Sequence, residues 1–234
     1  MPLTNNMSIR SIVTKYHEFI KRVITGFILG AAFWFLFLYL PPVYFSLVLV
    51  GILAQIIIFE WKNLFNIYSP LFWLTLPFYP ILPFVLLISM NTNPAYHDLL
   101  FILFILVSSH DTGSYIIGSL FGKHSIYPQI SPKKTWEGFF GGYLFASIGL
   151  MLLLWEQGNM KPWWFILGFA LIVCVLSFLG DLFESWLKRC ARVKDSGTIL
   201  PGHGGFLDRF DGILFAVFFF YVARDFLAVI FSKN

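Results

Sequence analysis

Long apolar runs alternate with short polar connections along most of this chain. An α-helix needs about 20 predominantly apolar residues to cross the hydrocarbon core of a bilayer. Strands of a membrane barrel would instead show apolar and polar residues in strict alternation, which these runs do not. Seven runs are candidate transmembrane helices, at about 23–40, 42–59, 70–90, 98–118, 139–156, 163–180 and 212–231. The pattern therefore predicts an all-α polytopic membrane protein.

Prolines mark one boundary between these runs and interrupt one of the other runs. Pro41 and Pro42 separate the first run from the second, as expected at a helix boundary. Pro77, Pro80 and Pro83 lie inside the third run, where each removes a backbone donor and clashes with the preceding turn. We expect the third helix to be kinked or broken.

Composition supports the membrane class and a single domain. Of the 234 residues, 58% are hydrophobic and 12% are charged, whereas about 25% of the residues in a soluble domain are charged. We expect one integral membrane domain over 1–234, with a cytoplasmic segment at 1–22, N-terminal helices at 23–97, and catalytic helices and loops at 98–234. Because no small-residue cleavage pattern follows the first apolar run, we expect an uncleaved anchor.

Cationic residues gather on one side of the predicted topology. With a cytoplasmic N-terminus, that side receives Lys62, Lys123, Lys133, Lys134, Lys188, Arg189, Arg192 and Lys194, and the other side receives chiefly Lys161. This is the distribution that the positive-inside rule requires. The two large polar loops, 119–138 and 181–211, then face the cytoplasm. The net charge of +4 reflects topology, and no nucleic-acid partner is expected.

A first polar constellation lies within the fourth apolar run and is centred on Asp111. An ionisable residue inside a span costs about 2.5–3.5 kcal/mol on insertion scales, so it normally faces a cavity lined by protein. Asp111 is therefore a functional candidate. The alternative is a structural hydrogen bond, or a boundary residue of a span that ends early.

A second constellation, Ser131 to Gly138, precedes the fifth run. Proline suits the first turn of a helix, so Ser131 could cap a helix beginning at Pro132 and leave free amides facing an anion. Lys133 and Lys134 are ordinary topology markers when taken alone. Nearby glycines would let a ligand approach the backbone, and this context makes the two lysines candidates for phosphate contacts.

A third constellation begins at Asp181. If the sixth run stays helical, Asp181, Glu184, Ser185 and Lys188 are spaced to share one helix face. A solvated helix face could show the same spacing. The following turn, Pro201 to Gly205, contains glycines whose amides suit a phosphate, whereas His203 could be a general base, a phosphate contact or a turn hydrogen bond.

Two carboxylates follow that turn. Asp208 and Asp211 could present oxygens to a hard cation from the start of the last helix. Oxygen ligands without paired cysteines or clustered histidines favour Mg²⁺ over zinc. The sequence contains no P-loop.

These residues carry a resemblance to a known family. The signature runs in order through Ser185, Lys188-Arg189, Lys194-Asp195, Pro201 to Gly205, Asp208-Arg209 and Asp211, and Asp111 to Tyr115 with Ser131 to Gly138 forms a second block. The pattern resembles that of phosphatidate cytidylyltransferases, also called CDP-diacylglycerol synthases. It covers about 108–142 and 177–212, with Ser114 as a mild departure from an expected Ala.

The resemblance implies that phosphatidate and CTP condense to CDP-diacylglycerol and pyrophosphate with Mg²⁺, alone or with a second cation. It also implies membrane lipids as partners, a bacterial inner membrane with a cytoplasmic site, and up to nine transmembrane helices; it leaves a homodimer open.

The expected cation ligands are Asp111, Asp181, Asp208 and Asp211. The expected catalytic residues are Lys188, His203, Asp208 and Arg209. The expected substrate-binding residues are Ser131, Lys133, Lys134, Ser185, Gly204 and Gly205.

Two other functions remain open on the sequence. A CTP-dependent kinase of an isoprenoid alcohol would also be polytopic with acidic cytoplasmic motifs, but it would release CDP instead of pyrophosphate. A membrane transporter would account for Asp111 and the proline-broken third run. The lack of repeated halves and the crowding of polar residues on one side argue against a transporter.

Overall fold

A computed structural model describes residues 26–28, 30–200 and 204–232 of the chain. Helices dominate this part. The elements are α2 (Pro42–Gln55), the π-helix η1 (Ile56–Glu60), α3 (Trp61–Leu64), α4 (Pro70–Thr75), the π-helix η2 (Pro77–Ile81), α5 (Leu82–Thr92), α6 (Pro94–Phe121), β1 (Ser125–Tyr127), β2 (Ser131–Thr135), α7 (Trp136–Glu156), α8 (Trp163–Cys190), α9 (Leu207–Val222) and α10 (Arg224–Phe231).

Five continuous helical segments among the described residues are long and apolar enough to cross a membrane. They are Pro42–Leu64, Pro70–Thr92, Pro94–Phe121, Trp136–Glu156 and Trp163–Cys190. A sixth span results if α9 and α10, which meet at 84°, count as one. The all-α membrane class is confirmed, but the expected count of seven to nine spans is not. The first predicted span lies partly outside the described residues, and a shorter apolar helix, Gly26–Tyr39, occupies its place.

Several spans differ in extent from the prediction. The helix predicted to end near residue 180 continues to Cys190, because Glu184, Ser185 and Leu187 are buried against other elements and do not leave the helix for solvent. The last run is not a straight span over 212–231. It begins at Leu207 and turns sharply between α9 and α10.

The predicted break in the third run is confirmed. Pro77 to Ile81 forms a π-helical segment between α4 and α5, and within it Tyr79 has φ −152° and ψ 95°, outside the helical region. Proline at positions 77 and 80 removes backbone donors that a regular helix would use. The segment Pro70–Thr92 is therefore kinked within its length, although it remains one continuous candidate span.

The predicted helix start at Pro132 is wrong. Ser131 to Thr135 forms strand β2, which pairs antiparallel with β1, so Ser131 is not a helix cap. Helix α7 begins at Trp136, and Thr135 caps it by accepting a hydrogen bond from the Gly138 N–H at 3.1 Å. The proline fits a short exposed strand because its missing donor leaves no buried group unpaired.

Helices α6 and α7 approach each other through glycines. A Cβ on Gly142 would lie 2.5 Å from the carbonyl oxygen of His110, and one on Gly113 would lie 2.7 Å from the Phe145 side chain. Small residues permit this spacing, which is typical of helix pairs in membranes. The contact fixes the His110–Asp111 segment of α6 against the start of α7.

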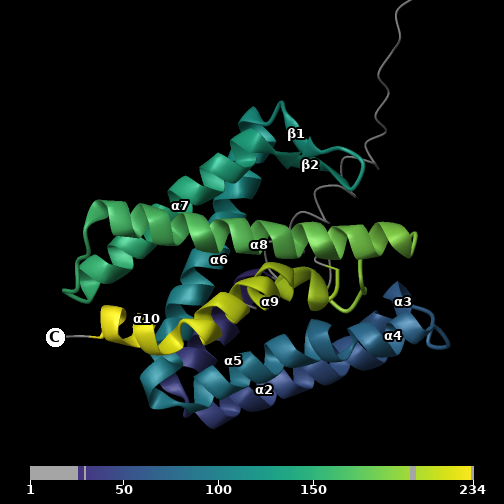
Figure 1. Cartoon of the computed structure of the whole chain (residues 1–234), viewed down its shortest axis with the longest axis horizontal. Helices are drawn as coiled ribbons and strands as arrows, with labels where there is room; N and C mark the ends of the chain where they lie inside the picture. Colours follow the sequence, from purple (N-terminus) through teal and green to yellow (C-terminus); the bar gives the residue numbers. More distant parts are fainter. Residues whose placement is uncertain (1–25, 29, 201–203, 233–234) are drawn as a thin grey trace, which may run out of the picture.

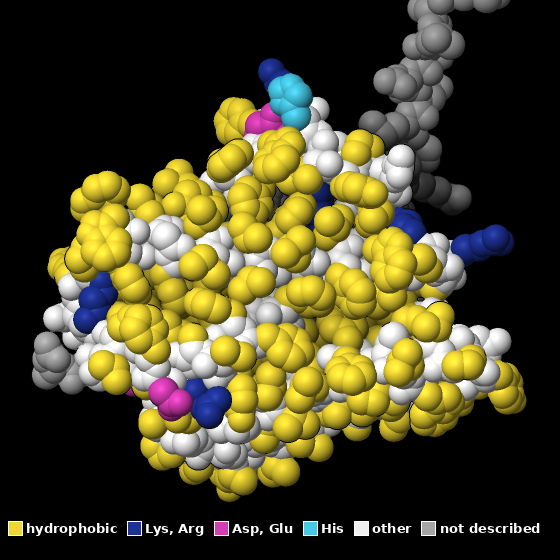
Figure 2. Space-filling model, in the orientation of Figure 1, with side chains coloured by type: hydrophobic (Ala, Val, Ile, Leu, Met, Phe, Trp, Pro, Cys, Tyr) yellow, Lys and Arg dark blue, Asp and Glu magenta, His cyan; other side chains and the backbone are white. Residues whose placement is uncertain are grey.

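The elements that carry polar residues meet at one end of the helix assembly. In Figure 1, α8 crosses the middle, α9 lies beside it, and α2 and α5 lie below; the hairpin, the end of α8 and α3 are all on the right. Buried side chains such as Phe84, Leu103 and Phe220 form the core between these helices. Hydrophobic side chains cover most of the face in Figure 2, with charged side chains mainly toward its edges. A membrane would accommodate this surface.

Candidate functional site

A polar cavity of about 340 Å³ lies where α6, the β2–α7 junction, α8 and the start of α9 converge. Its lining includes the cationic side chains of Lys133, Lys134, Lys188 and Arg209. It also includes the carboxylates of Asp111, Asp181, Asp195, Asp208 and Asp211. The structure therefore brings together residues from all three constellations of the sequence.

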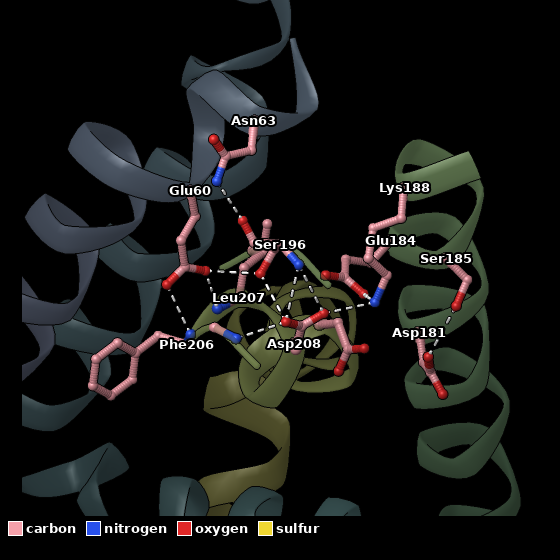
Figure 3. A network of polar contacts seen from close by, with 12 residues as sticks. Glu60, Asn63, Asp181, Glu184, Ser185, Lys188, Ser196, Phe206, Leu207 and Asp208 are labelled. Carbon is pink, nitrogen blue, oxygen red and sulfur yellow. Dashed lines mark hydrogen bonds and ion pairs between the residues drawn. The ribbon is translucent and has the colours of Figure 1, made fainter. Parts of the chain in front are cut away.

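The predicted polar face of α8 is confirmed. Because α8 continues past residue 180, Asp181, Glu184, Ser185 and Lys188 follow one another along one side of it. Lys188 forms an ion pair with Glu184 one turn away, and the Ser185 hydroxyl lies 3.5 Å from Asp181 Oδ1. Figure 3 shows these side chains on α8.

Three carboxylates form a compact acidic cluster: Asp181, Glu184 and Asp211. Each can contribute one oxygen, and those oxygens all lie within 4.8 Å of one another. Glu184 is fully buried, and apart from its ion pair with Lys188 neither of its oxygens accepts a hydrogen bond from the described part of the chain. Grouped carboxylate oxygens with spare acceptor capacity fit a hard cation such as Mg²⁺. The sequence interpretation included Asp181 and Asp211 in this role but left Glu184 out.

Asp208 has a different environment from Asp211, although only three positions separate them. Its Oδ1 lies 2.7 Å from Lys188 Nζ. Its Oδ2 accepts hydrogen bonds from the Gly205 N–H at 2.7 Å, the Ser196 N–H at 3.1 Å and the Ser196 hydroxyl at 2.9 Å. Asp208 thus lies between Lys188 of α8 and the residues Ser196 and Gly205, whereas Asp211 faces Asp181 and Glu184. Cation binding by Asp208 stays a prediction.

The motif glycines have specific tasks in the loop. Gly204 has φ +79°, which is the left-handed region that glycine adopts without strain. The Gly205 amide, expected to face phosphate, donates to Asp208 in this structure. Phosphate binding by these two amides stays a prediction, and His203 lies outside the described residues.

The predicted phosphate-binding cations differ in exposure. Lys133 on β2 and Arg209 on α9 are exposed at the cavity wall. Lys134 is mostly buried, lies 2.5 Å from Asp181 Oδ2 and is 5.4 Å from the centre of the Phe178 ring. Lys134 therefore connects the hairpin to α8 across the cavity, whereas Lys133 and Arg209 keep charge available at its mouth.

The α6 wall carries Asp111 and two residues beside it. Asp111 lines the cavity with 55% of its side chain exposed, and its Oδ1 lies 3.5 Å from the Nδ1 of buried His110. The other ring nitrogen of His110 lies 3.5 Å from Ser114 Oγ. Asp111 stands apart from the acidic cluster, and its cation role stays a prediction. Ser131 and Ser185 are not among the described residues that line the cavity.

The sequence interpretation missed Glu60 and Ser196. Glu60 is fully buried, and its carboxylate accepts hydrogen bonds from the Ser196 hydroxyl and the Phe206 and Leu207 N–H groups, each at 2.9 Å (Figure 3). It follows directly on the second apolar run, where an ionisable residue usually marks the end of a span. That position was the available signal, and it did not distinguish a boundary residue from a site residue.

Comparisons with known proteins identify the family of the chain. Residues 67–227, more than half of the chain, match the model of the cytidylyltransferase family. A protein of Staphylococcus aureus (strain COL) named phosphatidate cytidylyltransferase is 51% identical over 116 residues, which is 49% of this chain and 44% of that protein. A protein of the same name from Staphylococcus haemolyticus is 48% identical over 115 residues, with 49% and 44% covered. The matched segment is thus less than half the length of these relatives. The chain belongs to the cytidylyltransferase family.

Proposed function

We propose that this protein transfers the cytidylyl group of CTP to phosphatidate, producing CDP-diacylglycerol and pyrophosphate. The observation that carries the proposal is the cavity itself, in which cationic and carboxylate side chains converge at one end of a set of membrane helices. The relatives named phosphatidate cytidylyltransferase support it. Both proposed substrates require such a site: one is a lipid with a phosphate headgroup, and the other is a nucleoside triphosphate.

The reaction needs positioning and charge neutralisation more than a protein nucleophile. An oxygen of the phosphatidate phosphate attacks the α-phosphorus of CTP, and the bond from that phosphorus to the bridging oxygen of the β-phosphate breaks. The electron pair of the broken bond leaves with pyrophosphate. In this proposal Lys133 and Arg209 bind phosphate oxygens at the cavity mouth, because both are exposed there. Fixed cations that hold the reacting groups in line lower the barrier.

Lys134 has a second part in the proposed cycle. In this structure it is paired with Asp181. A nucleotide phosphate that enters the cavity offers the ammonium group another anion, so Lys134 can exchange its carboxylate partner for phosphate. That exchange would leave Asp181 free to bind a cation.

A divalent cation fits the acidic cluster. Asp181, Glu184 and Asp211 would hold Mg²⁺. Asp208 and Asp111 stay proposed ligands, for this cation or for a second one. The bound cation supplies positive charge against the triphosphate and the departing pyrophosphate.

The substrates arrive from different phases in this proposal. Exposed apolar side chains on the membrane helices would accept the acyl chains of phosphatidate from the bilayer, and CTP would enter from the cytoplasm. The inner membrane of a bacterium provides both phases, because its bilayer contains the lipid and its inner face contacts the cytoplasm.

The direct test is incubation of purified protein with phosphatidate, Mg²⁺ and CTP labelled at the α-phosphate. We expect label in the lipid extract and release of one pyrophosphate per labelled lipid. Asp181→Asn should lower the rate about 100-fold or more, as does loss of one electrostatic group in a preorganised site. Glu156→Gln makes the same chemical change at an exposed carboxylate at the far end of α7 and should leave the rate unchanged. An unlabelled lipid phase refutes the proposal, and release of CDP identifies a kinase.

A further inference from the structure

We infer that Glu60 is a positioning residue for the cytidylyltransferase site, contributed by the N-terminal helices. It lies upstream of residues 67–227, the part that matches the family model. The inference rests on the proposed function for its kinetic consequences, but the contacts that define it are independent of the reaction. Glu60 holds the loop that carries Ser196 and the first turn of α9 that carries Asp208.

The Glu60 carboxylate is saturated with hydrogen bonds from three different segments. Its Oε1 accepts from the Phe206 N–H at 2.9 Å and from Gln55 Nε2 at 3.2 Å. Its Oε2 accepts from the Leu207 N–H and the Ser196 hydroxyl, both at 2.9 Å. Burial of a carboxylate is costly unless such donors surround it. Here the donors include the free amides at the start of α9, where the helix dipole also favours a negative charge.

Ser196 links Glu60 to Asp208. Its hydroxyl oxygen lies 2.9 Å from Glu60 Oε2 and 2.9 Å from Asp208 Oδ2, and its N–H also donates to Asp208. A serine hydroxyl has one proton, so it can donate to only one of the two carboxylates at a time. The position of Ser196 is therefore set jointly by both acids. Asp208 in turn holds Lys188 at the cavity wall.

Two loop glycines are packed against Glu60. A Cβ on Gly205 would lie 2.5 Å from Ser196 Oγ and would overlap Glu60 Oε2. A Cβ on Gly197 would lie 2.9 Å from Glu60 Cγ. Distances this short leave no room for a side chain. The need for glycine at position 205 of the motif, and at position 197 before it, thus follows partly from the packing of the Glu60 side chain against both residues.

The backbone at Glu60 is specialised for this contact. The π-helix Ile56–Glu60 interrupts the helical segment between α2 and α3. The wider turn places Gln55 beside Glu60 five positions on, and π-turns occur often at functional sites. A second tether follows at Asn63, whose side chain donates to the Ser196 carbonyl oxygen at 2.9 Å.

Glu60→Gln is the sharpest test because it keeps the volume and removes one acceptor. Each carboxylate oxygen accepts from a backbone N–H. Whichever oxygen is replaced by an NH₂ group, that new donor therefore faces a backbone N–H, which is also a donor and cannot accept its hydrogen bond. We expect kcat for CDP-diacylglycerol formation to fall 10- to 100-fold while KM for CTP changes less than threefold. Ser196→Ala should also lower kcat, and the double variant should lose less than the product of the two single losses.

A matched control loosens the N-terminal helices without contact to the site. Asn91 is also fully buried, and its side chain donates to the Pro42 carbonyl oxygen at 2.6 Å and to Ser46 Oγ at 2.9 Å. Asn91→Ala should lower the unfolding temperature of the full chain in detergent but leave kcat near that of the wild type. If Asn91→Ala lowers kcat as much as Glu60→Gln at equal loss of stability, Glu60 is only a structural anchor and the inference fails.

Hydrogen exchange separates this inference from the proposed function. Amides in the segment containing Ser196 and Leu207 should exchange faster in Glu60→Gln, whereas those of the α6–α7 pair should not change. Faster exchange supports the link even if the wild-type protein makes no CDP-diacylglycerol, in which case only the proposed function fails. Unchanged exchange in the segment overturns the inference, whatever the activity.

Discussion

Lys188 is the cation on which the buried charges of the site depend. Its Nζ contacts both Asp208 and Glu184, and the Glu184 side chain is fully buried while that of Lys188 is 12% exposed. Two carboxyl groups share one ammonium group. Removal of Lys188 would leave both acids unpaired, which is costlier than removal of one acid.

We predict a large loss of stability in Lys188→Met and a partial recovery in Lys188→Met with Glu184→Gln. Loss of one member of a buried ion pair costs about 3–5 kcal/mol, and the second change removes one of the two carboxyl groups left without their partner. Thermal unfolding of the purified protein in detergent measures both, with Lys188→Arg as the charge-retaining control. If the double variant is no more stable than Lys188→Met, Glu184 does not depend on Lys188 for its charge balance.

Helical spacing explains which site residues the sequence predicted. Asp181, Glu184 and Lys188 follow one helix face, so their proximity required only that α8 continue. Asp208 and Asp211 also suit one face by spacing, yet they contact different partners, because Ser196 and Gly205 donate to Asp208 whereas Asp211 faces Asp181 and Glu184. Glu60 reaches Ser196 across 136 positions of the chain. No local pattern encodes a contact of that range.

At the scale of elements, the α6–α7 interface controls the distance between Asp111 and the hairpin. We predict that Gly142→Ala lowers activity and stability, because its Cβ would meet the backbone oxygen of His110 at 2.5 Å, where no side chain can move aside. Overpacking of this kind costs about 1–3 kcal/mol. Rates of lipid labelling and unfolding temperatures measure the effect.

The control for this change is Gly168→Ala on α8. A Cβ at Gly168 meets nothing within 4 Å, so the variant should behave like the wild type in both measurements. Equal behaviour of the two alanine variants would show that α6 and α7 can separate without consequence for the site.

Elements made of long apolar runs were predictable, and those held by tertiary contacts were not. The runs that became α6, α7 and α8 were found, although α8 extends further because its polar end is buried. Strand β2 has the sequence Ser-Pro-Lys-Lys-Thr, which lacks strand alternation. Its hairpin is instead tied to α8 by the Lys134–Asp181 pair and by Arg189 Nε, which donates to the Ile130 carbonyl oxygen at 3.0 Å.

At the scale of the whole molecule, the order of the spans places every site segment on one side. The chain reaches that side at the ends of α3, α6 and α8, and leaves it again at the starts of α4, α7 and α9. The hairpin and the 191–206 connection lie between these ends. The opposite side carries the turns near residues 93 and 157–162. Since cationic residues concentrate on the site side, the positive-inside rule predicts that the cavity faces the cytoplasm.

Cysteine labelling tests this orientation with the native side chains. Cys190 is exposed at the end of α8 on the site side, and Cys174 is buried. A membrane-impermeant maleimide should label Cys190 in inverted vesicles but not in intact bacterial cells. Met160→Cys in a Cys190→Ser background should show the reverse, because the exposed Met160 lies in the connection at the opposite ends of α7 and α8. Labelling of Cys190 in intact cells would place the cavity away from cytoplasmic CTP, and the proposed supply of nucleotide would then be wrong.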